Sequence, residues 1–271
     1  MVSIRYSGGF GGLLTAVFET YRLKLPKNLN VMPMGCSNIG LFDETITVEE
    51  DSKKANRVRS GIIKIGGKAI LEKLYHAYLS EQPNADTQIA AYIRLMVDSK
   101  RDISGNHLEP CIRDVMKMAQ LVRREEHRMH AFVRFQRTQD DVYFAAIAPT
   151  ANVVPLLGSF FQRRYPAQQW LIYDEKRQYG IYYDLEKVSQ VELDLPLQGR
   201  DLPDYLLMEG ERQYQRLWKD YFDAVNIPER KNMKLHIRHV PKRYWKYLPE
   251  KFLESTGCPN FDSISTVFGI E

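Results

Sequence analysis

The sequence predicts an α+β fold, with an antiparallel sheet built on a strand-strand-helix-strand-strand unit between a helical N-terminal region and C-terminal helices. Apolar residues recur at helical spacing through residues 1–128, alternate with polar ones in residues 129–185, and return to helical spacing within residues 186–271. At 271 residues and 44% hydrophobic content, the chain can bury one large core or two modest ones. We expect residues 1–271 to form one domain with these three sub-regions, although spacing alone also allows two.

The N-terminus predicts a short strand, Ile4 to Tyr6, followed by a glycine-rich turn and a helix that begins near Phe10. Glycine-rich turns between a strand and a helix bind phosphates in dinucleotide folds and P-loops, but SGGFGGLL has the glycine spacing of neither. Tight packing of the strand on the helix is the favoured interpretation. The free amides of the helix N-terminus could still hold an anion.

Four further helices are expected before the sheet. Pro26 to Phe42 predicts a surface loop because it carries Asn and Pro without any periodicity. A strand is expected next, at Thr45 to Glu49. The helical stretches that follow are Lys53 to Ile65, Gly67 to Leu79, Asp86 to Val97 (capped by Asp86 or Thr87) and, after a loop at Lys100 to His107, Leu108 to Met129.

The central region reads as two hairpins joined by a helix. Ala131 to Gln136 and Val142 to Ile147 flank one turn, and Trp170 to Tyr173 and Tyr179 to Asp184 flank the other. The helix between the hairpins is expected at Ala151 to Arg163, with Leu156, Leu157, Phe160 and Phe161 packed on the sheet. Leu185 to Pro203 then predicts a connecting arm. An amphipathic helix over Asp204 to Val225 is expected to turn these residues inward: Leu207, Tyr214, Leu217, Trp218, Tyr221 and Phe222.

Positive charge is concentrated in one segment. Residues 212–251 hold eleven Lys or Arg and four Asp or Glu, a net charge of +7, against +4 for the whole chain. Residues 117–137 form a second basic cluster. Clustered cations bind polyanions by neutralising phosphates, and the neighbouring Tyr and Trp rings offer surfaces on which bases stack. The alternative is that the aromatics are core anchors and the cations are simply solvated.

Composition argues against other classes. No run approaches the roughly 18 apolar residues that span a bilayer, and the N-terminus lacks the charged-then-apolar order of a secretion signal, so a cytoplasmic location without membrane contact is expected. Cys36, Cys111 and Cys258 are widely spaced and odd in number. We expect three free thiols, no metal and no cofactor.

Catalytic candidates are few. His127 lies near the end of a helix, where a histidine serves as acid, base or phosphate donor, but a structural role is the more common one. Glu125 and Glu126 point about a quarter-turn apart, so they are expected to form salt bridges rather than a carboxylate pair. His236 and His239 have no metal-site spacing and favour phosphate contact. Thr150 or Asn152, before the crossover helix, is expected to cap that helix.

The chain resembles a bacterial family of probable DNA metabolism proteins, built on a domain of unknown function. The resemblance runs from Ile4 to Glu250. It rests on these motifs: Tyr6-Ser7-Gly8-Gly9-Phe10, Leu13 to Glu19, Arg57-Val58, Leu79-Ser80-Glu81, Arg124 to Arg128, Phe132 to Phe135, Ala148-Pro149, Asn152 to Leu157, Trp170 to Asp174 and Arg243 to Glu250.

The resemblance implies a genetic context rather than a catalytic residue. Family members look like partners of a radical-SAM iron-sulfur protein, and some relatives carry an appended uracil-DNA glycosylase domain. This sequence has no match to the glycosylase motifs and no cysteine set for a radical-SAM cluster, so neither activity is carried over.

The leading hypothesis is therefore a nucleic-acid-binding accessory protein that presents DNA or RNA to a radical-SAM enzyme during repair or modification. The alternatives are a nucleobase- or nucleotide-processing enzyme, with His127 and a carboxylate such as Glu81 or Glu126 in a pocket, and a protein-interaction scaffold. The residues expected to contact phosphates are Arg124, Arg128, Arg134, Arg238, Lys242 and Arg243, with Tyr244 and Trp245 stacking or packing.

Overall fold

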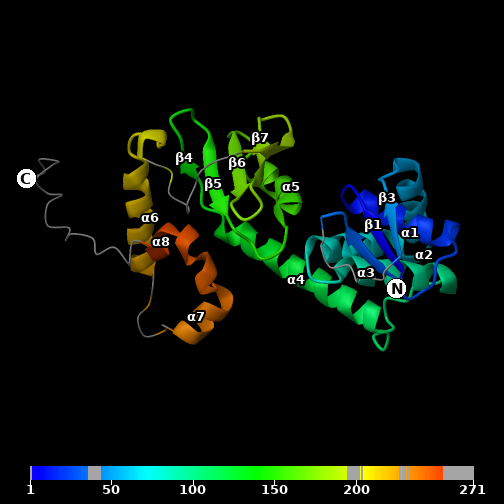
Figure 1. Cartoon of the computed structure of the whole chain (residues 1–271). Helices are drawn as coiled ribbons and strands as arrows, with labels where there is room; N and C mark the ends of the chain where they lie inside the picture. Colours follow the sequence, from blue (N-terminus) through cyan, green and yellow to red (C-terminus); the bar gives the residue numbers. More distant parts are fainter. Residues whose placement is uncertain are drawn as a thin grey trace, which may run out of the picture. The chain divides into compact units, whose positions relative to one another are not determined.

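The computed structural model describes residues 2–35, 44–193, 202, 204–225, 227, 230 and 232–252. The chain divides into two compact units, the first comprising Met1–Glu126 with Thr150–Val153 and the second His127–Pro149 with Val154–Glu271. Each unit contains one sheet and several helices, and the fold is mixed α+β as the sequence predicts (Figure 1). The expected antiparallel sheet is wrong, because one sheet is parallel and the other mixed.

The first unit is built on a parallel sheet of three strands in the order β2-β1-β3. These are β1 (Val2–Tyr6), β2 (Asn30–Pro33) and β3 (Glu44–Val48), and helix α1 (Phe10–Arg22) makes the crossover from β1 to β2. Strand β2 falls where the sequence predicts only a loop. Its buried Val31 pairs with Ile4, and its edge position tolerates Pro33 at the strand end.

Three helices complete the first unit. They are α2 (Ser52–Leu79), which breaks at Gly67, α3 (Ala85–Ser99) and α4 (Pro110–Phe132), whose residues from His127 onward belong to the second unit. The N-cap of α3 is Asn84, not Asp86 or Thr87; the Thr87 hydroxyl instead bonds both backbone groups of Val31, at 3.0 and 3.1 Å. The core joins the sheet to these helices through Ile4, Leu13, Leu14, Ile62, Leu74, Ile89 and Ile93.

The sheet of the second unit has five strands in sequence order. They are β4 (Gln136–Arg137), β5 (Tyr143–Ile147), β6 (Trp170–Asp174), β7 (Tyr179–Tyr183) and β8 (Val188–Glu192). All neighbours pair antiparallel except β5 and β6, which are parallel. Helix α5 (Val154–Arg164) connects these two, and a helical crossover returns the chain to the same end of the sheet, so the strands it joins run in the same direction. Strand β8 lies in the expected connecting arm.

The C-terminal part of the second unit contains η1 (Asp204–Leu206), α6 (Glu211–Val225), α7 (Met233–His239), η3 (Lys242–Tyr247) and α8 (Pro249–Phe252). The sequence correctly places a helix at α6, and Leu207 before this helix is buried as expected, but the apolar face of α6 itself is not turned inward. No residue of α6 is buried, and Tyr214, Leu217 and Tyr221 are 70%, 61% and 60% exposed. None of the described helices combines the length and apolarity needed to cross a bilayer. Cys36, Cys258 and residues 253–271 lie outside the described part of the chain.

Candidate nucleic-acid interface

The basic segment of residues 232–252 is anchored to the second unit by aromatic side chains. Tyr244 and Tyr247 of η3 are buried, and the Trp245 indole donates a hydrogen bond to the Val240 carbonyl at 2.9 Å. The Tyr247 hydroxyl donates to Oε2 of Glu175 at 2.6 Å, and burial together with this carboxylate raises the pKa of the Tyr247 phenol. The buried tyrosines therefore hold η3 against the second unit, while its cations remain exposed at the surface.

Each cation of η3 lies over an aromatic ring. The Arg243 guanidinium lies 4.6 Å from the centre of the Tyr244 ring, and the Lys246 ammonium lies 4.6 Å from the centre of the Tyr247 ring. The Lys242 ammonium lies 5.9 Å from the centre of the Trp245 ring. Such contacts hold the stems of long side chains on apolar surface while the charged heads stay in water. The ring contacts thus position the cations on the surface of η3.

The segment carries a large excess of positive charge. Residues 232–252 contain six Lys or Arg and one acid, Glu250. Glu250 is buried and accepts a hydrogen bond from Arg134 at 2.8 Å, so it does not neutralise the surface cations. Lys246 approaches Glu175 at 3.5 Å, whereas Arg238 and Lys242 have no carboxylate partner among the described residues. The exposed side of α7 and η3 is therefore a basic surface.

Helix α6 continues this surface with exposed aromatic rings. The Lys251 ammonium lies 4.6 Å from the Phe222 ring of α6 and 5.7 Å from the Trp245 ring of η3. The Trp218 indole of α6 donates to Oε2 of Glu250 at 3.0 Å. These contacts link α6 to η3 through α8, and the exposed rings of Tyr214 and Tyr221 belong to the helix that contacts this end of the basic segment.

The structure brings most of the predicted phosphate and aromatic residues together. Arg238, Lys242, Arg243, Tyr244 and Trp245 all lie on α7 and η3, and Tyr244 packs within the protein against Phe132, with ring centres 5.4 Å apart.

The cations of the α4 region are dispersed. Arg134, which follows α4, is joined to this part of the second unit through Glu250. Arg128 is half-buried in the second unit, whereas Arg124 falls in the first unit with its Nε directed at the Gln120 carbonyl.

The residues of the enzyme alternative line no common cavity in the described part of the chain. His127 is exposed on α4 directly after Glu126, while Glu81 lies in the first unit. His127 lines none of the three cavities characterised in the described part of the chain. Glu125 is buried and accepts the Thr150 backbone N–H at 2.6 Å, which is a structural role. The neighbouring His130 stacks on Phe160 at 3.9 Å, and burial lowers its pKa, aided by the charges of His127 and Arg163.

The glycine-rich turn of the first unit faces one of the protein's own carboxylates. A methyl group added at Gly8 or Gly11 would collide with the Glu50 carboxylate, so this side chain packs directly on the start of α1. Glu50 also lines an open pocket of about 420 Å³ beside β3. The position that a phosphate takes in a phosphate-binding turn is therefore bordered by an acid.

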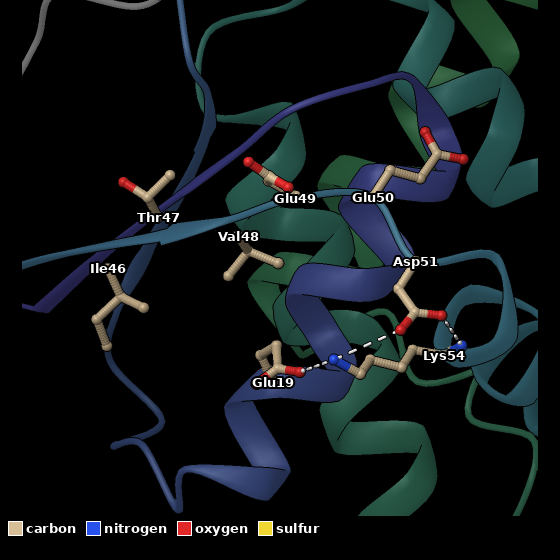
Figure 2. Close-up of a pocket in the computed structure, with 8 residues that line it drawn as sticks. All are labelled: Glu19, Ile46, Thr47, Val48, Glu49, Glu50, Asp51 and Lys54. Atoms are coloured by element: carbon tan, nitrogen blue, oxygen red, sulfur yellow. Dashed lines mark hydrogen bonds and ion pairs between the residues drawn. The ribbon is translucent and has the colours of Figure 1, made fainter.

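The other charges of that pocket compensate one another. Figure 2 shows the Lys54 ammonium between Glu19 and Asp51, at 3.0 and 3.6 Å. Burial favours the neutral form of Glu19, but Lys54 and Arg22 outweigh it and hold the pKa of Glu19 below its usual value. These side chains form an ion-pair network that connects α1 to α2.

The sequence singles out residues 212–251 as a whole but does not predict four of its members individually as interface residues: Glu250, Lys251, Tyr214 and Tyr221. Glu250 lies in the motif Arg243 to Glu250, on which the family resemblance partly rests. This motif is the one feature of the sequence that points to Glu250. Tyr214 and Tyr221 are seven residues apart on one face of α6. That spacing was interpreted as a buried stripe, and nothing in the sequence shows whether another element covers it.

Comparison with known proteins gives a family but no function. Residues 83–250 match DUF4130, a domain of unknown function, and the chain belongs to this family. No curated protein and no solved structure matches the chain. The matched region starts beside α3 and ends at Glu250, so it includes the whole basic segment up to the buried carboxylate.

Proposed function

We propose that this DUF4130 protein binds single-stranded nucleic acid on the surface of α6, α7 and η3, as an accessory in DNA repair or modification. The carrying observation is the position of Lys251, whose ammonium lies within 6 Å of both the Phe222 ring and the Trp245 ring. Lys251 therefore links the helix with the exposed aromatic rings to the basic segment. Arg238, Lys242 and Arg243 supply phosphate contacts there, and Tyr214 and Tyr221 supply rings for stacking.

The exposed rings favour a single strand over a duplex. Tyr214 and Tyr221 are seven residues apart on α6, which separates them by about 10 Å along the helix axis. A base stacks on such a ring only when it is unpaired and turned away from its own neighbours. A duplex would engage the cations alone. We therefore expect salt-sensitive binding of both forms but tighter binding of the single strand.

The biological setting of the proposal comes from the resemblance described above. It implies a radical-SAM iron-sulfur protein as the partner, which would act on the strand that this protein presents. The basic surface supports the nucleic-acid part of the proposal only. Association with the partner is a separate question, which co-purification of the two proteins addresses.

A protein-interaction scaffold is the second candidate, and the exposed apolar face of α6 is the observation that favours it. Leu217 and Val225 are 61% and 56% exposed on the same helix as the two tyrosines. Apolar residues gathered on one exposed face mark docking surfaces for proteins. Nucleic-acid binding has the stronger support because the adjoining η3 surface is strongly basic and its cations are held on aromatic rings.

Fluorescence anisotropy decides between the two candidates. The purified chain is titrated into labelled single-stranded DNA, duplex DNA and RNA of equal length, each at several salt concentrations. We expect the affinity for single strands to exceed that for the duplex, and log Kd to vary linearly with log salt. If no nucleic acid is bound at low salt, the proposal fails and the scaffold is favoured.

A further inference from the structure

The first unit contains a second candidate site, which is lined by acidic rather than basic side chains. A cavity of about 740 Å³ opens where β1 and β2 end. Its other walls are formed by the first turn of α3 and by Asn152. Ligands of open parallel sheets bind outside the carboxyl ends of the strands, and the volume falls in the range of small-molecule sites. The location and size therefore suit a small ligand.

A hydrogen-bonded row of side chains reaches this cavity. Tyr6, the last residue of β1, donates a hydrogen bond to the Asp86 carboxylate, and the Tyr78 hydroxyl is bonded to Tyr6. Tyr6 is fully buried, whereas Asp86 is half-buried and lines the cavity. The phenols hold the carboxylate in place and leave part of its accepting capacity for a ligand.

The walls of the cavity are rigid and locally strained. Thr87 is tied to both backbone groups of Val31, and the Asn152 N–H donates to the Leu79 carbonyl at 2.9 Å. Glu81 has a φ of 51°, a region that residues other than glycine seldom adopt, whereas Asn84, at 63°, is of a type that enters this region more readily. Strained residues persist where the surrounding contacts fix them, and they cluster at binding sites.

The charge of the lining restricts the ligand. Among the described residues, the lining contains the carboxyl groups of Asp86 and Glu81 and no Lys, Arg or His. A phosphate would find no cation there, whereas N–H groups would find acceptors in a carboxylate and in the side-chain amide of Asn152. A carboxylate accepts two parallel N–H bonds when a ligand presents adjacent donors in one plane.

We propose that this cavity binds a small, phosphate-free molecule with adjacent N–H donors, the class of guanine-type nucleosides and guanidinium compounds, with Asp86 as the principal acceptor. The site goes beyond nucleic-acid binding and lies wholly in the first unit, so either activity can fail without the other.

Affinity for such a ligand depends on the ionisation of Asp86. Burial raises the pKa of Asp86 to about 6, and the Tyr6 hydrogen bond opposes this shift only in part. The titratable groups around Asp86 are Tyr6 on β1 and Tyr78 on α2. Burial raises the pKa of Tyr78, and the negative charge of Glu81 contributes to this shift. The carboxyl group is mostly protonated at pH 5 and ionised at pH 8, so the affinity should rise by about tenfold or more across this range.

Calorimetric titration of the full chain with guanosine and with agmatine tests the site, with GMP as the phosphate-bearing counterpart. We expect saturable binding of at least one of the first two at pH 8, weakened at least tenfold by Asp86→Asn. The control Asp114→Asn removes an exposed carboxylate from the first turns of α4 in the same unit and should leave binding unchanged.

The two probes separate the two ligand sources. Binding of guanosine alone identifies a nucleobase site, and binding of agmatine alone identifies a guanidinium site. The proposal is overturned if neither probe binds at pH 8, if GMP binds more tightly than guanosine, or if the affinity of the unmodified chain does not rise from pH 5 to pH 8. The last measurement needs no variant and holds even if Asp86→Asn misfolds.

Discussion

Arg134 and Glu250 are 116 residues apart in the chain, yet Nη2 of Arg134 lies 2.8 Å from Oε1 of Glu250. The other carboxylate oxygen of Glu250 accepts the Trp218 indole N–H, and the Arg134 guanidinium lies 5.5 Å from the Trp218 ring. Glu250 is buried, and the arrangement joins the end of α4, helix α6 and α8 around one carboxylate. The position of the proposed interface depends on this carboxylate.

Replacing Glu250 by Gln should destabilise the second unit by about 1–3 kcal/mol, because the variant keeps the shape but leaves Arg134 without its charged partner. Burial favours neutral Glu250, but Arg134 outweighs it and lowers the pKa of Glu250 below 4.5. The pair therefore stabilises the fold above pH 4.5, and its contribution is lost as the pH falls further. The difference between the two proteins should shrink in acid.

Urea unfolding followed by tryptophan fluorescence measures this effect, since all three tryptophans, Trp170, Trp218 and Trp245, lie in the second unit. The control is Glu209→Gln, which removes an exposed carboxylate from the same unit. Equal stability of Glu250→Gln and the unmodified chain at pH 7 would show that the pair contributes nothing.

Lys242 and Arg243 should act as phosphate contacts. Replacing both with Gln is expected to weaken single-strand binding and to reduce the slope of log Kd against log salt by about 1.4, the value for two lost contacts. Lys64→Gln with Lys68→Gln, two exposed cations of α2 in the first unit, serves as the matched control. The assignment is wrong if the double variant retains both the affinity and the slope.

Tyr214 and Tyr221 should carry base stacking. Each change to Ala is expected to cost about 1–3 kcal/mol of single-strand binding, with little effect on duplex binding or on the salt slope. Tyr205→Ala is the control, because Tyr205 is 72% exposed but lies on η1 outside α6. Anisotropy with single-stranded and duplex probes makes the measurement. A similar loss for both probes would exclude stacking and point to a general effect on α6.

The sequence predicts most elements of the fold, and its errors have physical causes. The two central hairpins are confirmed, but the sheet is not wholly antiparallel, because the helix between β5 and β6 makes these two strands parallel. Strand β2 is not predicted because Asn30–Pro33 is short and ends in proline, and strand β8 is not predicted because Val188–Glu192 is largely polar. Such strands form because a neighbouring strand supplies hydrogen bonds, which periodicity alone does not reveal.

The candidate site was predictable where its residues are contiguous. Lys242 to Trp245 form one run, so their charge and rings are visible in the sequence. Helical spacing shows that Tyr214 and Tyr221 share a face, but it does not show whether that face is covered. The contacts of Arg134 with Glu250 and of Tyr6 with Asp86 join distant residues, and only the fold brings them together.

The glycines of the glycine-rich turn differ in how closely other atoms surround them. A methyl group at Gly12 would collide with the Ser7 carbonyl, whereas one at Gly9 would meet no atom within 4 Å. Gly12→Ala should therefore destabilise the first unit by about 1–3 kcal/mol despite the better helix propensity of Ala, because backbone cannot move aside as a side chain can. Gly9→Ala is the control and should be nearly neutral. Hydrogen exchange of residues 2–22 measures both, and equal protection in the two variants would contradict close packing of β1 on α1 as the reason for Gly12.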